Sequence, residues 1–155
     1  MPNAMERIRA WFDSNNWTPF DFQEEVWKAY LQGESGLIYS PTGTGKTYAA
    51  WLGPLIEWME NHPTGTITSN GTRKRSAAPP LRVLWITPLR ALASDTEAAL
   101  QSVLSQLDIH WTVETRTGDT STTVRNRQRK QLPTVLITTP ESLSLLLTHP
   151  DAVET

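Results

Sequence analysis

The chain has 155 residues, which is the length of one ordinary domain and is enough to bury a hydrophobic core without cross-links. It contains no cysteine, which excludes disulfide scaffolds, cysteine-ligated zinc, thiol catalysis and iron–sulfur clusters. The 14 lysines and arginines against 16 aspartates and glutamates give a net charge of −2, which excludes a strongly basic nucleic-acid binder but not a local basic face. There is no apolar run of about 18 residues and no signal-peptide pattern, so we expect a cytoplasmic protein.

The charge is unevenly distributed along the chain. Residues 1–61 hold 8 acids and 4 bases, whereas residues 62–155 hold 8 acids and 10 bases. The basic excess is concentrated in residues 116–130, where five bases accompany one acid. We therefore expect an acidic front half and a rear half that carries a local basic face.

Short apolar runs alternate with helix-length segments along the chain. Residues 1–18 are expected to form an N-terminal helix and lead-in. The β-branched, continuously apolar runs that suit buried parallel strands are Gly36–Ser40, Leu81–Thr87, Trp111–Thr115 and Thr134–Thr139. The segments with apolar residues at helical spacing are Phe22–Gln32, Lys46–Glu60, Leu89–Leu107 and Glu141–Thr148. This alternation predicts an α/β fold in which a parallel sheet carries helices on both faces.

One segment, His62–Pro80, does not fit this alternation. It consists mainly of Thr, Ser, Gly, Pro and charged residues, and we expect it to be a long flexible loop. A loop longer than about 12–15 residues is usually functional or disordered. Its three consecutive bases, Arg73–Arg75, would allow a contact with a polyanion, and a plain solvated loop is the alternative.

The segment Ser40–Thr47, with the sequence SPTGTGKT, lies between an expected strand and an expected helix, which is the context of a phosphate-binding loop. Gly43 and Gly45 permit torsion angles closed to other residues, so successive N–H groups can turn toward a phosphate at the positive end of the helix. Lys46 would reach the outer phosphates, and Thr47 would give its hydroxyl to Mg²⁺. Ser40 stands where the strict pattern has glycine, and a chance turn is the alternative. The residues expected to bind a nucleoside triphosphate here are Thr42, Gly43, Thr44, Gly45, Lys46 and Thr47.

The form of this loop is similar to that of superfamily 2 helicases, which often lack the first glycine. Upstream of it, Phe20-Asp21-Phe22-Gln23 resembles their Q motif. The resemblance implies that the Gln23 amide reads the adenine edge of ATP and that Phe20 packs on the base. The alternative is that Phe20 and Phe22 belong to the core and that Gln23 is an exposed helix residue.

Three further segments resemble nucleic-acid motifs of the same helicases. Residues 87–92 (TPLRAL) resemble motif Ia, residues 117–119 (TGD) resemble the TGD motif, and residues 139–143 (TPESL) resemble motif Ib. Each follows an expected strand, and two of them open an expected helix, so their N–H groups would face a phosphate. The residues that the resemblance implies at the nucleic acid are Pro88, Arg90, Arg116, Thr117, Gly118, Thr139, Pro140 and Glu141.

These motifs also have plainer interpretations. Leu89 and Leu92 can form a core pair on one helix face while Arg90 is merely solvated. Thr139 and Pro140 are a good helix cap whether or not a phosphate is bound nearby.

The basic segment and the tryptophans leave similar alternatives open. On a helix, Arg125 and Arg129 would share one face while Arg127 points elsewhere, and that face is either solvated or a polyanion track. Most tryptophans are expected in the core, among them Trp51, Trp58 and Trp85, and Trp17 is expected to be the most exposed.

Together these motifs, over residues 11–149, resemble the large helicase-related (Lhr-type) DExH-box group of superfamily 2, in particular the ligase-associated DNA-repair helicases. The resemblance implies a RecA-like P-loop NTPase fold, ATP and Mg²⁺ as cofactors, and 3′-to-5′ translocation on single-stranded DNA with unwinding of a duplex or hybrid. It also implies partners among DNA-repair ligases or nucleases. Residues 19–155 would be a partial helicase ATP-binding domain, with its sheet incomplete at the C-terminus.

One motif of that group is absent from the sequence. ATP hydrolysis needs carboxylates that hold Mg²⁺ and orient water, and in these helicases a D-E-x-H motif supplies them. No such sequence occurs among the 155 residues. We therefore expect the N-terminal piece of a larger motor, inactive in hydrolysis by itself. The alternatives are a non-catalytic nucleotide- or nucleic-acid-binding module and a small-molecule P-loop kinase.

Overall fold

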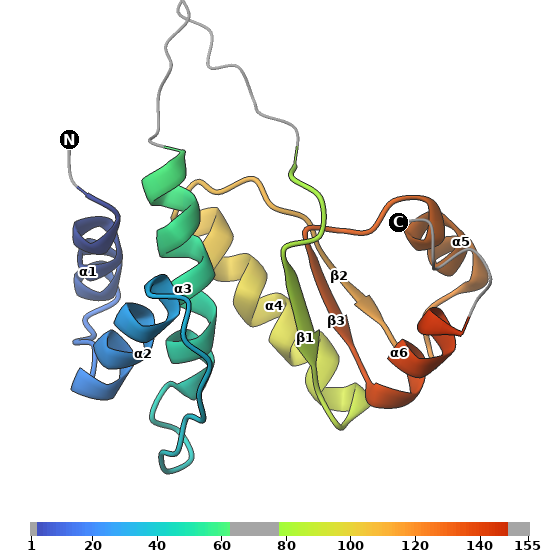
Figure 1. The fold of residues 1–155 in the computed structure, drawn as a ribbon, viewed down its shortest axis with the longest axis horizontal. Coiled ribbons are helices and arrows are strands. Elements are labelled where there is room, and N and C mark those ends of the chain that lie inside the picture. The colour runs from blue at the N-terminus through green and yellow to red at the C-terminus, as the bar shows by residue number, and fades with distance from the viewer. Residues whose placement is uncertain (1–2, 63–77, 149–155) are drawn as a thin grey trace, which may run out of the picture. The chain divides into compact units, whose positions relative to one another are not determined.

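The computed structural model describes residues 3–62 and 78–148. These residues fall into two compact units, 3–62 and 78–148. Figure 1 labels the helices and strands of each unit. The expected flexible loop at 62–80 lies almost wholly outside the described residues. No helix in the described ranges is long and apolar enough to cross a membrane.

The first unit is built from α1 (Ala4–Ser14), α2 (Asp21–Leu31) and α3 (Lys46–Asn61). A capping box starts α1: the Asn3 side chain accepts a hydrogen bond from the Glu6 N–H, and the Glu6 carboxylate accepts one from the Asn3 N–H, both at 2.8 Å. Both other helices pack against α3. The helix that follows the phosphate-loop sequence is therefore the centre of this unit.

Aromatic side chains fill the core of the first unit. Trp27 and Trp51 are fully buried, and Trp11 and Phe12 are nearly so. The ring of Tyr48, which lies one residue beyond the phosphate-loop sequence, meets Trp11 edge-on at 5.4 Å. The Trp27 indole N–H donates to the Tyr48 carbonyl at 3.2 Å. These contacts anchor the start of α3 in the core.

The second unit contains a three-stranded parallel sheet of β1 (Val83–Ile86), β2 (Val113–Arg116) and β3 (Val135–Thr138). The strand order is β1-β3-β2, so β3 lies in the centre and pairs with both neighbours. All four residues of β3 are buried. This explains why its sequence is continuously apolar or β-branched.

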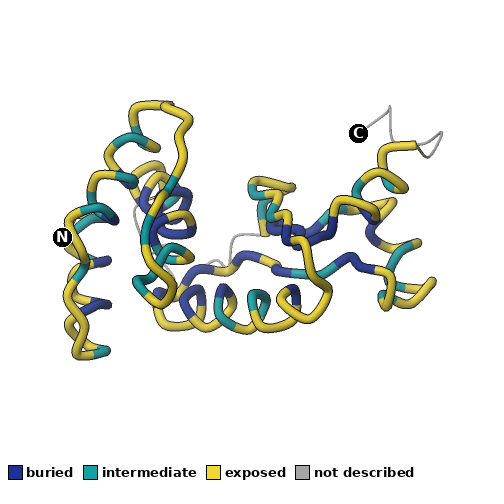
Figure 2. The backbone as a smooth tube through the Cα atoms, turned by 90° about the horizontal axis from the view of Figure 1, so that it is seen from below, coloured by how far each residue is buried: buried dark blue, intermediate teal, exposed yellow. Residues whose placement is uncertain are grey.

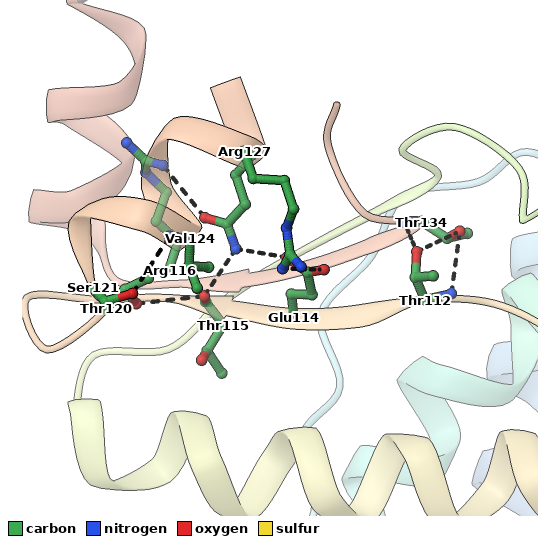
Figure 3. A network of polar contacts seen from close by, with 10 residues as sticks. Thr112, Glu114, Thr115, Arg116, Thr120, Ser121, Val124, Arg127 and Thr134 are labelled. Carbon is green, nitrogen blue, oxygen red and sulfur yellow. Dashed lines mark hydrogen bonds and ion pairs between the residues drawn. The ribbon is translucent and has the colours of Figure 1, made fainter. Parts of the chain in front are cut away.

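Three helices accompany the sheet: α4 (Arg90–Gln106), α5 (Thr122–Lys130) and α6 (Pro140–Leu147). Figure 3 shows α5 on one side of β2 and α4 on the other. Helices such as α4 are buried along one side and exposed along the other (Figure 2). The expected α/β fold with helices on both faces of a parallel sheet is confirmed.

The prediction of a strand at Gly36–Ser40 is wrong. The structure has no regular secondary structure at residues 34–40, and Leu37 and Tyr39 are 93% and 95% exposed. A strand exists only where a neighbouring strand satisfies its N–H and C=O groups. Among the described residues no strand pairs with this segment, so its apolar pattern alone does not produce a strand.

Candidate nucleotide and nucleic-acid sites

The phosphate-loop sequence forms the turn that precedes α3. Gly43 and Gly45 have φ angles of +83° and +80°, in the left-handed region that favours glycine. The Thr44 hydroxyl hydrogen-bonds with the Ser40 hydroxyl and donates to the Pro41 carbonyl at 2.8 Å. Because α3 begins directly after Gly45, its first N–H groups and the positive end of its dipole lie at this turn.

Lys46 is folded back onto its own loop. Its Nζ donates to the carbonyl oxygens of Ser40 and Pro41 at 2.6 and 2.7 Å. A phosphate oxygen is a stronger, charged acceptor than a carbonyl. An anion that enters the loop can therefore replace these carbonyls as partner of the ammonium group. The arrangement fits a phosphate-binding loop.

Gln23 links the Q-motif sequence to this loop. Its side chain is 2% exposed, its Oε1 accepts a hydrogen bond from the Phe20 N–H at 2.9 Å, and its Nε2 donates to the Gly45 carbonyl at 3.0 Å. Phe20 is 55% exposed and stacks on Phe22 with ring centroids 6.0 Å apart. The interpretation of Gln23 as an exposed helix residue and of Phe20 as core is therefore wrong.

Metal ligands are sparse near the loop. The described ranges hold no group of three or more histidine or acidic side chains placed to bind a metal. Thr47, the second residue of α3, is exposed and carries a hydroxyl. Mg²⁺ usually binds through few protein ligands together with substrate phosphates and water. The loop therefore fits a metal ion that arrives with a nucleotide.

The three nucleic-acid motifs begin at one edge of the sheet in the second unit. Ile86, Thr138 and Arg116 are the last residues of β1, β3 and β2, and they pair across the three strands. The segments 87–92, 139–143 and 117–119 directly follow these residues. In parallel sheets, ligands bind outside the carboxyl ends of the strands. The motifs therefore share the edge at which a ligand is expected.

Arg90 and the TGD motif are in direct contact at this edge. The Arg90 Nη1 lies 3.1 Å from the Asp119 Oδ1 in an ion pair whose side chains are 63% and 75% exposed. A Cβ atom added to Gly118 would lie 2.9 Å from the Arg90 Cζ. The guanidinium group of one motif thus lies against two residues of another motif that is distant in the sequence.

The third motif opens α6 as its sequence indicates. The Thr139 hydroxyl accepts a hydrogen bond from the Ser142 N–H at 3.5 Å, and Pro140 is the first helical residue. The expected cap is confirmed. Thr139 is buried, as are Thr87 and Thr117 at the ends of the other two strands, whereas Pro140 is exposed. Of the residues that the sequence implies at the nucleic acid, the exposed ones are Pro88, Arg90, Gly118, Pro140 and Glu141.

Arg116 lies under α5 and is 5% exposed. Its Nη1 donates to the Arg125 carbonyl at 3.2 Å and to the Gln128 Oε1 at 3.3 Å. Figure 3 shows Arg116 within the polar network between β2 and α5. Burial lowers the pKa of the Arg116 guanidinium, and the neighbouring charges of Arg125 and Arg129 lower it further. Its side chain therefore joins the end of β2 to α5 through these hydrogen bonds.

The roles of two residues in this region could not be predicted from the sequence. Arg125 Nη2 donates to the carbonyls of Thr117 and Gly118, both at 2.8 Å, and so holds the TGD loop. Gln128 is fully buried and donates to the Glu114 carboxylate at 2.9 Å. Glutamine has no propensity that marks such a position, and the basic composition of α5 masks it. Only the i, i+4 spacing of Arg125 and Arg129 suggested that α5 has a distinct face.

Comparison with protein families gives a match to "DEAD/DEAH box helicase" over residues 20–154. The chain is similar to "Lhr helicase/uracil glycosylase" of Escherichia coli K12, with 33% identity over 150 residues that cover 90% of this chain and 9% of that protein. It is also similar to "ATP-dependent helicase Lhr-Core" of Methanothermobacter thermautotrophicus, with 34% identity over 96% of this chain and 17% of that protein. The chain thus spans between 9% and 17% of the length of these relatives.

Solved structures with the same fold include two that contain DNA. Helicase Lhr of Mycobacterium smegmatis bound to single-stranded DNA and AMP-PNP matches with a TM-score of 0.68 and 30% identity, over 97% of this chain and 19% of that chain. The DUF1998 helicase MrfA bound to DNA and AMPPNP matches with a TM-score of 0.73 and 27% identity, over 99% of this chain and 20% of that chain.

Proposed function

Because this chain belongs to the DEAD/DEAH box helicase family, we propose that it is the ATP- and DNA-binding front part of a DNA helicase. The proposed activity of the whole protein is ATP-driven 3′-to-5′ translocation on single-stranded DNA, with unwinding of a duplex or hybrid, in DNA repair. DNA-repair ligases or nucleases are its proposed partners, and the proposed location is the cytoplasm. The observation that carries this proposal is the shared carboxyl edge of the sheet, from which three nucleic-acid motifs start.

In the proposed nucleotide site, the main-chain N–H groups of residues 42–47 surround the phosphates. Lys46 exchanges its contacts with the Ser40 and Pro41 carbonyls for contacts with phosphate oxygens. Bound Mg²⁺, held by the Thr47 hydroxyl and the phosphates, would neutralise the charge that develops on the phosphates. The supporting features are the two left-handed glycines and the ammonium group that already lies at the turn.

The adenine contact is proposed for Phe20 and Gln23. Phe20 offers an exposed ring. Each of the two hydrogen bonds of the Gln23 amide uses only part of its capacity, because an amide oxygen accepts two bonds and an amide nitrogen donates two. The remaining donor and acceptor suit the edge of a base once the buried side chain turns toward it. A base bound to Gln23 would also be connected to the phosphate loop through the Gly45 carbonyl.

The proposed nucleic-acid site uses the exposed side chain of Arg90 together with main-chain groups of the three motifs. The first N–H groups of α4 and α6 have no partner within their own helices and suit phosphate oxygens. Thr117 and Thr139 are buried, so they are proposed to shape the loops that approach the phosphates. Arg116 is proposed to act indirectly, by supporting α5 and the TGD loop.

The nucleotide site is tested by Lys46→Ala. Loss of the ammonium group should weaken ATP binding by about tenfold or more, because a charge-assisted hydrogen bond contributes roughly 1.5–3 kcal/mol. Titration with a fluorescent ATP analogue measures the affinity. Lys28→Ala, which removes an exposed lysine from α2, is the matched control. Unchanged affinity in the Lys46 variant, with the melting temperature preserved, would exclude the proposed role.

A further inference from the structure

We propose that Gly118 and Asp119 form a seat that positions the Arg90 guanidinium for a DNA phosphate. The TGD motif would then act on DNA through the arginine of another motif. This inference rests on the proposed function, because it assumes that Arg90 contacts a phosphate. It assigns Gly118 and Asp119 a positioning role.

Gly118 has no side chain, and this leaves room for the Arg90 guanidinium. Its φ angle is not among the positive ones, so backbone conformation does not require glycine here. The requirement comes from the neighbouring side chain: an added Cβ would lie 2.9 Å from the Arg90 Cζ and 3.0 Å from its Nη1. Because the obstructing atoms belong to the end of a flexible side chain, a methyl group at residue 118 would displace the guanidinium without disturbing the fold.

Asp119 supplies the orientation. Its Oδ1 engages the Arg90 Nη1 at 3.1 Å. A guanidinium has five donors in one plane, so a contact at one nitrogen restricts where the group lies and leaves other donors for a phosphate. The pair is largely exposed to solvent, and exposed ion pairs contribute little to folding stability. Loss of the contact should therefore leave the fold intact, so that a change in DNA binding can be measured separately from a change in stability.

The loop that carries the seat is held from its other side. Arg125 donates to the carbonyls of Thr117 and Gly118 at 2.8 Å. The Thr117 N–H donates to the Thr120 hydroxyl at 2.9 Å. A loop fixed by these bonds presents Asp119 at a defined place. This rigidity lets an exposed carboxylate orient the flexible Arg90 side chain.

The direction in which Asp119→Asn changes DNA affinity distinguishes a positioning role from a purely electrostatic one. A carboxylate beside a phosphate site repels DNA, so if charge alone mattered, Asp119→Asn would tighten DNA binding. If Asp119 positions Arg90, the same substitution should weaken binding. Gly118→Ala should also weaken binding, although it changes no charge. Asp119→Glu, which keeps the carboxylate, should restore part of the affinity.

The test compares these variants in the wild-type background and in an Arg90→Ala background, in the protein as its gene encodes it. Fluorescence anisotropy with a labelled single-stranded oligonucleotide, repeated at several salt concentrations, measures affinity. Gly118→Ala and Asp119→Asn should each weaken binding roughly twofold to fivefold and lower the salt slope by up to about one. In the Arg90→Ala background, Gly118→Ala should have no effect, and Asp119→Asn should have none or should tighten binding. Asp95→Asn, an exposed change on α4 with the same charge difference, is the control.

Two results would overturn the seat. The first is tighter binding by Asp119→Asn in the wild-type background. The second is an equal loss of affinity with and without Arg90, because the loop would then act by itself. Unchanged melting temperatures identify these results as effects on binding. If the unmodified protein does not bind single-stranded DNA, the proposed function itself fails, and the seat fails with it.

Discussion

Glu97 is an acidic side chain that α4 directs toward the sheet. Burial raises the pKa of its carboxyl group above the ordinary value, a hydrogen bond with Thr115 opposes the rise, and the charge of Glu114 adds to it. The folded protein therefore binds more protons than the unfolded chain between the unfolded and folded pKa values of this group. Its contribution to stability is present below that interval and is lost as the pH rises through the folded pKa.

Glu97→Gln should remove this pH dependence. The amide keeps an oxygen that can accept the Thr115 hydrogen bond and carries no charge to desolvate. We expect a gain of about 0.5 kcal/mol at neutral pH, and a smaller difference near about pH 4. Urea unfolding between these pH values measures it. Asp95→Asn, an exposed change on the same helix, is the control. Parallel pH profiles for wild type and the Glu97 variant would contradict the expectation.

At the scale of elements, the sheet shows what an apolar pattern can predict. The strands β1, β2 and β3 were predicted within a few residues, and each of them pairs with a neighbouring strand. All of β3 is buried, whereas β1 alternates between half-buried and exposed residues. Gly36–Ser40 has the same kind of pattern and no strand partner. A sequence pattern records which side chains are apolar, but it does not state whether a hydrogen-bonding neighbour is present.

In the candidate sites too, local geometry could be predicted from the sequence, whereas contacts between distant residues could not. The turn at Gly43 and Gly45 could be predicted because its geometry is encoded locally by glycines before a helix. The link from Gln23 to Gly45 spans 22 residues and depends on side-chain direction, which no local pattern contains. For the same reason the sequence did not reveal that Arg125 holds the TGD loop.

The docking of α5 on β2 depends on a buried amide. Gln128 is fully buried and hydrogen-bonds with Arg116, with the Glu114 carboxylate and with the Thr115 carbonyl. Gln128→Leu keeps a similar volume but leaves these polar groups without that partner. We expect a loss of about 1–3 kcal/mol in unfolding free energy, measured by chemical denaturation. Asn126→Leu, at an exposed position of the same helix, should cost much less. Equal losses would argue that the amide network does not hold α5.

At the scale of the whole molecule, the two kinds of site fall in different units. The phosphate loop and its Gln23 contact belong to the first unit, and the three motifs at the carboxyl edge belong to the second. Each arrangement is formed by contacts within its own unit. Binding of ATP and binding of DNA can therefore be measured as separate properties of this chain, by a variant in one unit and a readout in the other.

ATP hydrolysis requires more than ATP binding, because it needs carboxylates that hold Mg²⁺ and orient the attacking water. The 155 residues contain no D-E-x-H sequence, and the described residues offer no acidic cluster for a metal. We therefore expect these residues alone to bind ATP but to release no phosphate above background, with or without single-stranded DNA. A phosphate-release assay on samples shown to bind ATP measures this. DNA-stimulated release that disappears in Lys46→Ala would contradict the expectation, since carboxylates of this chain would then suffice for catalysis.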